Sequence, residues 1–341
     1  MKAIGIKKSL PISDDNSFIV FETEKPRPKG HDLLVKVKAV SVNPVDYKVR
    51  QNSAKDKELD SPKILGWDAV GVIEAVGDEV TLFGVGEEVY YAGDITRPGS
   101  NAEYQLIDER IVGKRPASLS LAEAAAMPLT SLTAWEAIFE RLLIKRQKGE
   151  GQNILIIGGA GGVGSIAIQI LKEMTKLNVI ATASRDETRD WCLKMGADEV
   201  ANHHNLAESV KKTGHRQIDY ILNFADTDGH WDAMAELIKP QGRICSIVEN
   251  KGELNLSAIR SKSVAFCWEL MFTRAMYQTD DMIEQHYILN SVADLLEQEL
   301  IKPTLNITLK GFTVDNFREA HRILESGKAI GKIAIVFDDE K

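Results

Sequence analysis

The feature that most constrains the fold is an apolar segment that runs into a cluster of glycines. Residues 154–157 read Ile-Leu-Ile-Ile, and Gly159, Gly161 and Gly164 then satisfy the spacing G-x-G-x-x-G. The glycines permit a tight turn, a close approach of the backbone to a pyrophosphate, and close packing of a helix on a strand. A purely structural turn is the alternative. We predict a dinucleotide site at the free N-terminus of the next helix, formed by Gly159, Ala160, Gly161, Gly162, Val163 and Gly164.

The pattern around this turn alternates between strands and helices. An alternation of this kind is typical of a parallel sheet covered by helices, which places the chain in the α/β class with a doubly wound Rossmann sheet. A further strand is expected within residues 263–270. The predicted strands are 153–157, 179–182, 219–223 and 242–248, and the predicted helices are 163–174, 187–195 and 231–238.

The first 125 residues have a different character. Short apolar runs at 33–40, 70–76 and 88–91 alternate with glycines, which predicts a barrel-like β domain. Helical patterns follow at 119–126, where Ser120 is a plausible N-cap, and at 132–143. After a long predicted helix at 282–300, the chain returns to short β segments that end in 332–337.

Composition narrows the possible partners and compartments. A chain of 341 residues favours two domains, and a net charge of −8 argues against a nucleic-acid or anionic-membrane surface. We expect no signal peptide and no spanning helix, because no apolar run is long enough. Three cysteines do not make a disulfide framework, so a reducing cytoplasm is expected.

The residues after the second strand of the predicted sheet indicate which dinucleotide binds. A chain that binds NAD usually has an acidic residue there, about 20 positions after the last glycine, to hold the ribose hydroxyls. Here Ser184 and Arg185 occupy that position, and the first carboxylate is Asp186. Arg185 would pair with the 2′-phosphate of NADP, so NADPH is the predicted cofactor. The alternative is that Arg185 merely begins the next helix in solvent.

Three motifs resemble those of a known family. Residues 66–77 resemble the G-H-E-x-x-G-x-V stretch of zinc alcohol dehydrogenases, 42–46 resemble the N-P-x-D/E segment of quinone oxidoreductases and zeta-crystallin, and 160–164 are similar to their nucleotide loop. The chain thus resembles the zinc-free, quinone-oxidoreductase-like branch of the medium-chain dehydrogenases/reductases, where "zinc-type alcohol dehydrogenase-like" proteins belong.

The resemblance implies a domain plan and an assembly. It implies a GroES-like β-barrel catalytic domain at 1–126, a Rossmann NADP-binding domain at 127–271, and a return to the catalytic domain at 272–341. It also implies a homodimer joined at the sheet edge formed by Val264–Leu270.

The sequence argues against zinc independently of the resemblance. A catalytic zinc site needs three ligands of the Cys, His or carboxylate type. Residues 1–191 contain no cysteine, and His31 is their only histidine. The ligand positions of the zinc relatives fall within 42–46, at Trp67 and near Leu129, and Asp68 alone makes no zinc site. His203 and His204 lie in the predicted Rossmann half, where exposure in a loop is simpler than ligation. We expect no zinc.

Without zinc, hydrogen-bond donors must stabilise the charge that develops on a hydride acceptor. That task is easier for a quinone or an α,β-unsaturated carbonyl than for a simple ketone, and the resemblance favours the same substrates. Asn43 matches the asparagine of the quinone-reductase motif and is the first donor candidate; capping of the turn before Pro44 is the alternative. Tyr47 or Lys48 is a candidate proton donor, and Asp46 a candidate orienting group.

Further candidate cofactor contacts are Thr130 and Thr133, which precede a helix where the family approaches the nicotinamide, and His203. Helix capping is the alternative for the two threonines. Two other functions stay open: a zinc-free carbonyl or alcohol oxidoreductase, and a non-catalytic NADPH-binding protein with a structural or RNA-interacting role. The acidic balance of the chain disfavours RNA.

Overall fold

The alternating segments form a six-stranded parallel sheet, which confirms the predicted α/β class. The strand order is β11-β10-β9-β12-β13-β14, so the chain moves outward from β9 in one direction and then returns to continue on its other side. This reversal beside β9 is the point at which open α/β sheets bind ligands. The strands are β9 (Asn153–Ile157), β10 (Asn178–Thr182), β11 (Glu199–Ala201), β12 (Ile218–Asn223), β13 (Ile238–Ser246) and β14 (Ala265–Trp268).

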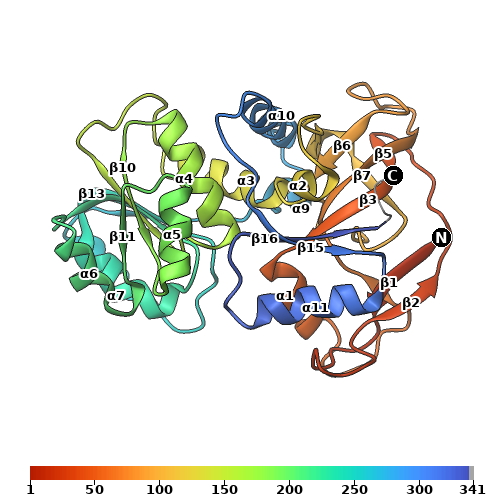
Figure 1. Ribbon diagram of the computed structural model, residues 1–341, viewed down its shortest axis with the longest axis horizontal. Helices are drawn as coiled ribbons and strands as arrows, with labels where there is room; N and C mark the ends of the chain where they lie inside the picture. Colours follow the sequence, from red (N-terminus) through yellow and green to blue (C-terminus); the bar gives the residue numbers. More distant parts are fainter. Residues whose placement is uncertain (338–341) are drawn as a thin grey trace. The chain divides into compact units, whose positions relative to one another are not determined.

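Helices cover this sheet, and for that reason its central strands are apolar on both faces. Residues 154–157 of β9 are fully buried. α4 and α5 lie beside one another (Figure 1), joined by a hydrogen bond from the Trp191 indole to the Ser165 hydroxyl of 2.8 Å. The helices are η2 (Glu136–Arg141), α4 (Gly162–Met174), α5 (Asp186–Lys194), η3 (His203–Asn205), α6 (Leu206–Lys212), α7 (Thr227–Leu237) and α8 (Ser257–Arg260).

The computed structural model describes residues 1–337, and the chain divides into two units. Residues 133–271 form the unit with the parallel sheet, and residues 1–132 form the other unit together with the segment that begins at Phe272. The first break thus follows Leu132, six residues beyond the predicted boundary, and the second follows Met271.

The other unit is built on two sheets, ordered β15-β16-β3-β5-β6-β8 and β2-β1-β4, with β7 also paired to β3. Apart from the parallel pair β15–β16, these strands pair antiparallel. The strands are β1 (Lys2–Ile6), β2 (Ile19–Glu22), β3 (Asp32–Val42), β4 (Lys63–Ile64), β5 (Asp68–Val76), β6 (Glu88–Tyr91), β7 (Tyr104–Asp108), β8 (Val112–Lys114), β15 (Leu305–Lys310) and β16 (Lys332–Val336).

Among the helices of this unit that were not predicted, two form a pair. α1 (Pro44–Asn52) and α11 (Val314–Glu325) pack against each other (Figure 1), and the buried Arg50 of α1 pairs with Glu325 of α11 at 2.5 Å. The segment after residue 300 is therefore not made of short β elements alone. The remaining helices are η1 (Glu109–Ile111), α2 (Leu121–Ala125), α3 (Pro128–Trp135, which leads into the other unit), α9 (Thr273–Tyr277) and α10 (Glu284–Glu297).

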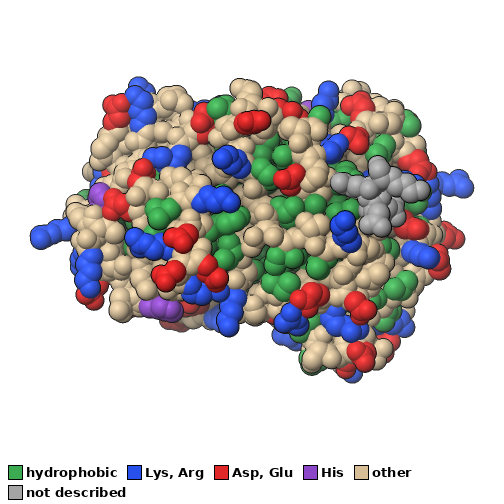
Figure 2. All heavy atoms as spheres, viewed as in Figure 1, with side chains coloured by type: hydrophobic (Ala, Val, Ile, Leu, Met, Phe, Trp, Pro, Cys, Tyr) green, Lys and Arg blue, Asp and Glu red, His purple; other side chains and the backbone are tan. Residues whose placement is uncertain are grey.

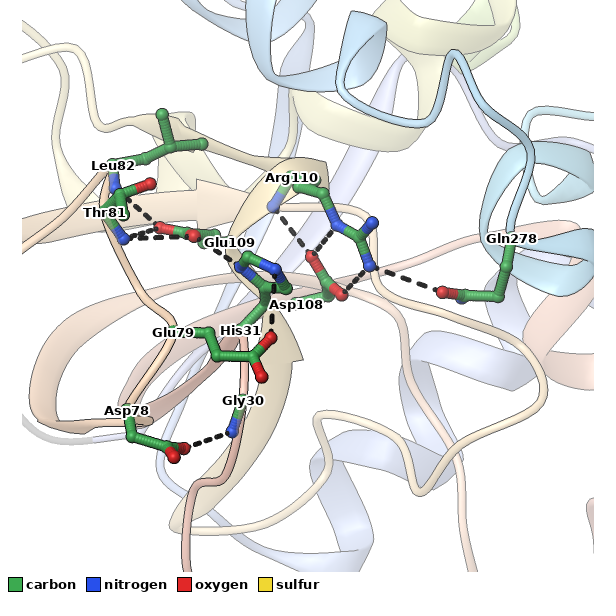
Figure 3. Close-up of polar contacts among 10 residues, drawn as sticks. All are labelled: Gly30, His31, Asp78, Glu79, Thr81, Leu82, Asp108, Glu109, Arg110 and Gln278. Atoms are coloured by element: carbon green, nitrogen blue, oxygen red, sulfur yellow. Dashed lines mark hydrogen bonds and ion pairs between the residues drawn. The ribbon is translucent and has the colours of Figure 1, made fainter.

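His31 lies in a polar network with two glutamates (Figure 3). Its Nδ1 is 2.8 Å from an oxygen of the buried Glu109, and its Nε2 is 3.4 Å from the exposed Glu79. The Glu109 carboxylate also accepts hydrogen bonds from the backbone N–H groups of Thr81 and Leu82. A buried carboxylate needs such partners, and this one fixes the loop at 79–82 to the end of β7.

The surface is mixed in charge. Figure 2 shows basic and acidic side chains interspersed on the face in view, without a large area of one sign.

Among the helices of residues 1–337, none combines the length and apolarity that crossing a membrane requires. All three cysteines are free thiols.

Candidate cofactor and catalytic sites

The glycine turn follows the carboxyl end of β9 and is tied to the end of β10. Gly158 has a φ of 89°, a left-handed conformation that favours glycine. Its N–H donates to the Thr182 hydroxyl at 3.0 Å, and the N–H of Gly159 donates to the Thr182 carbonyl at 3.2 Å. Thr182, which the sequence reasoning missed, therefore holds the turn in place from the neighbouring strand.

The three motif glycines differ in how much room the surrounding atoms leave for a side chain. A Cβ on Gly159 would lie 2.8 Å from the Ala181 Cβ, and one on Gly164 would lie 2.7 Å from the Gly159 Cα. The protein's own packing therefore requires both glycines. A Cβ on Gly161 would meet only the Gly158 carbonyl oxygen, at 3.6 Å. The space beside Gly161 is open, as a pyrophosphate bound to the turn would need, so these residues fit a dinucleotide.

The predicted selectivity residues lie at the same edge of the sheet. Ser184 and Arg185 follow β10, and the N–H of Ala183 donates to the carbonyl of Ala201 at the end of β11. Arg185 is the N-cap residue of α5 and pairs with the exposed Glu187 at 3.0 Å. It thus begins a helix, as the alternative interpretation held, and its position directly after β10 is the one that the NADP prediction requires.

His203 also lies at this edge, directly after β11. Its ring is 4.7 Å from that of His204 and 6.4 Å from that of His230, measured between centroids. Burial and the two neighbouring histidines lower the pKa of His203. Thr130 and Thr133 were expected to precede a helix, but both are buried within α3, where the Thr130 hydroxyl donates to the Met127 carbonyl at 3.3 Å.

The second candidate site is a buried polar cluster in the β-rich unit, formed by Asn43, Asp68 and Lys332. Asn43 occupies the N-cap position of α1, but its side chain makes no capping hydrogen bond there. Its side-chain amide donates to Asp68 at 2.8 Å and to the Ser41 carbonyl at 3.4 Å, and its amide oxygen accepts from the Lys332 ammonium. Each of the three residues is at most 3% exposed.

Lys332 is the functional candidate that the sequence reasoning missed. Its ammonium donates to Asp68 at 2.9 Å, to the Val42 carbonyl at 3.2 Å and to Asn43. The other oxygen of Asp68 accepts from the backbone N–H of Leu129 at 2.7 Å. No local sequence signal marks Lys332, because it lies 264 positions from Asp68 and begins an otherwise apolar strand.

Asp46 completes the cluster from the first turn of α1. Its carboxyl accepts from the N–H of Asn43 at 2.8 Å. Burial raises the pKa of Asp46 to about 7, although that hydrogen bond and the Lys332 charge both lower it. Tyr47 is half-buried, and burial together with Glu325 raises the pKa of its phenol. Lys48 is exposed.

The cluster lies at or next to the positions that the resemblance assigned to zinc ligands: Asn43 lies within 42–46, Asp68 follows Trp67, and the Leu129 backbone binds Asp68, whereas Lys332 matches none of these positions. These residues do not fit zinc: they include no Cys or His, Lys332 already pairs with Asp68, and Asp46 binds the backbone N–H of Asn43. Within residues 1–337, no three His, Cys, Asp or Glu side chains are grouped so as to hold a metal ion.

Comparisons with known proteins decide the family. Residues 29–130 match the alcohol dehydrogenase GroES-like domain, and residues 195–335 match the zinc-binding dehydrogenase family. The chain is 46% identical to a zinc-type alcohol dehydrogenase-like protein of Staphylococcus epidermidis, over 98% of this chain and 99% of that protein. The chain belongs to the medium-chain dehydrogenase/reductase superfamily.

Other members of the superfamily agree with this assignment. Human quinone oxidoreductase is 30% identical over 91% of each chain. A crystal structure from Rhizobium etli, described as a zinc-dependent alcohol dehydrogenase protein, has a TM-score of 0.93 and 48% identity, covering 98% of each chain. The quinone oxidoreductase of Escherichia coli, solved with NADPH, shares the fold at a TM-score of 0.82 and 22% identity, covering 98% of this chain and 100% of that one. The predicted GroES-like domain and Rossmann sheet are confirmed.

The glycine turn yields a prediction that separates packing from cofactor binding. We expect Gly164→Ala to lower the free energy of unfolding by about 1–3 kcal/mol, because its Cβ overlaps backbone that cannot move. We expect Gly161→Ala to leave the free energy of unfolding unchanged. It should weaken NADPH binding by about 10-fold or more, and a 10-fold loss corresponds to about 1.4 kcal/mol of binding free energy. Thermal melts and fluorescence titrations with NADPH measure the two effects. Unaltered NADPH affinity in Gly161→Ala would place the pyrophosphate elsewhere.

The raised pKa of Asp46 yields a prediction about stability and pH. Between its usual pKa of about 3.9 and about 7, the folded chain binds more protons than the unfolded chain. The free energy of unfolding should therefore fall as the pH rises through this range. Asp46→Asn should reduce this fall, measured by denaturation at pH 5 and pH 8. The control Asp78→Asn should not, because Asp78 is exposed and its pKa is lowered. Equal slopes for the parent and Asp46→Asn would contradict the prediction.

Proposed function

We propose that this protein is an NADPH-dependent reductase that delivers hydride to quinones or α,β-unsaturated carbonyl compounds without zinc. The observation that carries the proposal is the buried cluster of Asn43, Asp68 and Lys332, in which Asn43 and Asp68 lie at or next to positions that the resemblance assigned to zinc ligands. The name of the human relative, a quinone oxidoreductase, supports the same substrate class.

The substrate class follows from what the cluster lacks. A zinc ion would act as a Lewis acid on the oxygen of an alcohol or a ketone. The residues here offer hydrogen bonds instead, which stabilise a developing charge less strongly than a metal does. A quinone or an enone spreads that charge over a phenolate or an enolate and so needs less stabilisation. Simple ketones are therefore poorer acceptors for this chain.

Each catalytic candidate has a proposed part. Asn43 donates a hydrogen bond to the acceptor's oxygen by exchanging its long 3.4 Å bond to the Ser41 carbonyl, while its bond to Asp68 is retained. Asp46 orients Asn43 through the backbone N–H that it accepts. Tyr47, Lys48 and water are the alternative sources of the proton that completes reduction.

The cofactor proposal rests on the carboxyl edge of the parallel sheet. When bound, NADPH supplies the hydride. The turn at 159–164 binds its pyrophosphate at the start of α4, and Ser184 and Arg185 bind the 2′-phosphate. His203 lies at the same edge and lines the adenosine end, and Thr130 and Thr133 approach the nicotinamide.

We also propose a homodimer formed through β14. This strand is the last of the sheet within the described chain, and it pairs only with β13. Trp268 and Leu270 are 44% and 50% exposed beside its free edge. Exposed apolar edge strands are usually covered or paired.

The three free thiols fit a reducing compartment such as the cytoplasm.

The function is tested by following NADPH oxidation with a quinone, an enone and the saturated ketone that matches the enone. We expect kcat/KM for the quinone or the enone to exceed that for the saturated ketone by about 100-fold or more, because the ketone's charge stays on one oxygen. Prior dialysis against a chelator should not change the rate. Loss of activity on chelation with recovery in Zn²⁺ would overturn the zinc-free proposal, and NADPH binding without oxidation of any acceptor would favour a non-catalytic role.

The cofactor preference is tested at Arg185. We expect the parent protein to bind NADPH more tightly than NADH, and Arg185→Asp to weaken NADPH binding by about 10- to 100-fold, since a charge-assisted hydrogen bond is lost. Titration of each cofactor by fluorescence gives the dissociation constants. Glu187→Gln is the matched control, because it removes the partner of Arg185 and should not weaken NADPH binding. Equal affinity of the parent for the two cofactors would disprove the preference.

The assembly is tested by light scattering at micromolar concentration. We expect the mass of a dimer for the parent and a shift toward monomer in Trp268→Lys, which adds a charge beside the β14 edge. Leu256→Lys changes a leucine that is 55% exposed at the N-cap of α8, outside β14, and should leave the mass unchanged. A parent that is a monomer at this concentration would rule out the proposed dimer.

A further inference from the structure

The Lys332 ammonium is coordinated in the manner of a small cation. Its three N–H groups point to three oxygens: a backbone carbonyl from Val42, the amide oxygen of Asn43 and a carboxylate oxygen of Asp68. A lysine ammonium has three donors and no acceptor, so all of its hydrogen-bonding capacity is used. The side chain is 4% exposed, and that of Asp68 is fully buried.

The cost of burying these charges indicates what Lys332 contributes. Removing one partner of a buried ion pair leaves an uncompensated charge, which is strongly unfavourable. Lys332 is a charged donor to Asp68, and it shares an oxygen of that carboxylate with the neutral amide of Asn43. Its other oxygen holds Leu129 at the start of α3. The ammonium therefore stabilises the carboxylate to which both Asn43 and the start of α3 are attached.

Lys332 also decides how the Asn43 amide is oriented. The amide oxygen faces the ammonium, so the amide nitrogen must face Asp68 and Ser41. The reverse orientation would direct N–H groups at the ammonium, which accepts no hydrogen bond. Because the ammonium has no free proton, it acts on a substrate only through Asn43 and Asp68, which makes Lys332 a positioning residue.

We propose that Lys332 is a tethered cation, covalently supplied by β16, that takes over the charge-balancing part of the metal in zinc-dependent members of the superfamily. Its removal leaves a site for a free primary ammonium ion, bound by Val42, Asn43 and Asp68. The catalytic consequence rests on the proposed function, whereas the cation site itself does not.

The test is chemical rescue of Lys332→Ala. This substitution deletes three methylenes and one ammonium group, which together correspond to n-propylammonium. Thermal stability is measured with n-propylammonium chloride, with n-propanol as the neutral molecule of the same shape, and with tetramethylammonium chloride as a cation that cannot donate hydrogen bonds. We expect saturable stabilisation of Lys332→Ala by n-propylammonium alone, because a ligand that binds only the folded state raises its stability.

Hydride transfer gives the second readout. We expect Lys332→Ala to lose about 100-fold in kcat with the best acceptor, as misplaced catalytic groups do, and to regain about 10-fold or more in saturating n-propylammonium. NADPH affinity should stay unchanged. If the acceptor panel shows no activity at all, the thermal readout still decides the cation site, so failure of the proposed function and failure of this proposal are distinguishable.

Two control variants sharpen the result. Lys172→Ala breaks an exposed ion pair, in which the Lys172 Nζ lies 2.7 and 2.8 Å from the two carboxylate oxygens of Asp198. This variant should lose no kcat and should not be stabilised by n-propylammonium. The double variant Lys332→Ala with Asp68→Asn removes the buried anion as well and should no longer respond to n-propylammonium.

The proposal is overturned if n-propanol rescues as well as n-propylammonium, because Lys332 would then only fill space. It is also overturned if Lys332→Ala has the same thermal stability and kcat as the parent, or if n-propylammonium still stabilises the double variant. Failure of Lys332→Ala to fold even in n-propylammonium would overturn it too, because this amine restores every deleted atom. Folding of Lys332→Ala only when n-propylammonium is present would support it.

Discussion

The antiparallel pairing of β16 with β3 is the contact on which the candidate catalytic site depends. It aligns Ile333 with Val42, and the preceding residue, Lys332, thereby reaches the carbonyl of Val42 and the side chains of Asn43 and Asp68. Without this register the ammonium would be displaced along β3 or turned to the other face of the sheet, since successive side chains of a strand alternate. One strand pairing therefore sets both the architecture of the β-rich unit and the charge balance of its centre.

The two candidate sites are constructed from different kinds of interaction. The cofactor turn consists almost entirely of backbone, with Thr182 holding it and with glycines that leave room for a ligand. The Asn43 cluster consists of side chains whose charges compensate one another in the interior. A backbone site tolerates changes in the neighbouring side chains, whereas a buried polar network requires every partner to be present. This difference explains why the glycine spacing was enough to predict the cofactor turn, whereas no short motif contained all the residues of the Asn43 cluster.

Most of the parallel sheet was predictable because β9, β10 and β12 carry apolar runs, and β9 was predicted with its observed bounds; the three-residue β11 was not predicted. The helix α1 was not predicted, because the residues that it buries are the charged Asp46 and Arg50, which a hydropathy pattern assigns to the surface. α11 did carry a signal: Thr313 caps it, and Phe317 and Ala320 recur at helical spacing. Within the site, Asn43 and Asp46 were found from a local motif. Lys332 was out of reach, because its partner is fixed by strand register across 264 positions.

The same strand register has a consequence for how the chain is made. Ser41 and its hydrogen-bond partner Ile333 are separated by 292 positions, with the whole parallel-sheet unit between them. At about 5–20 residues per second, ribosomal synthesis leaves the 39–42 edge of β3 without its partner for roughly 15–60 seconds. For that interval the nascent chain carries an unpaired strand edge, and Asp68 has no ammonium beside it. The order of synthesis thus makes the β-rich unit, although it begins first, the last to be completed.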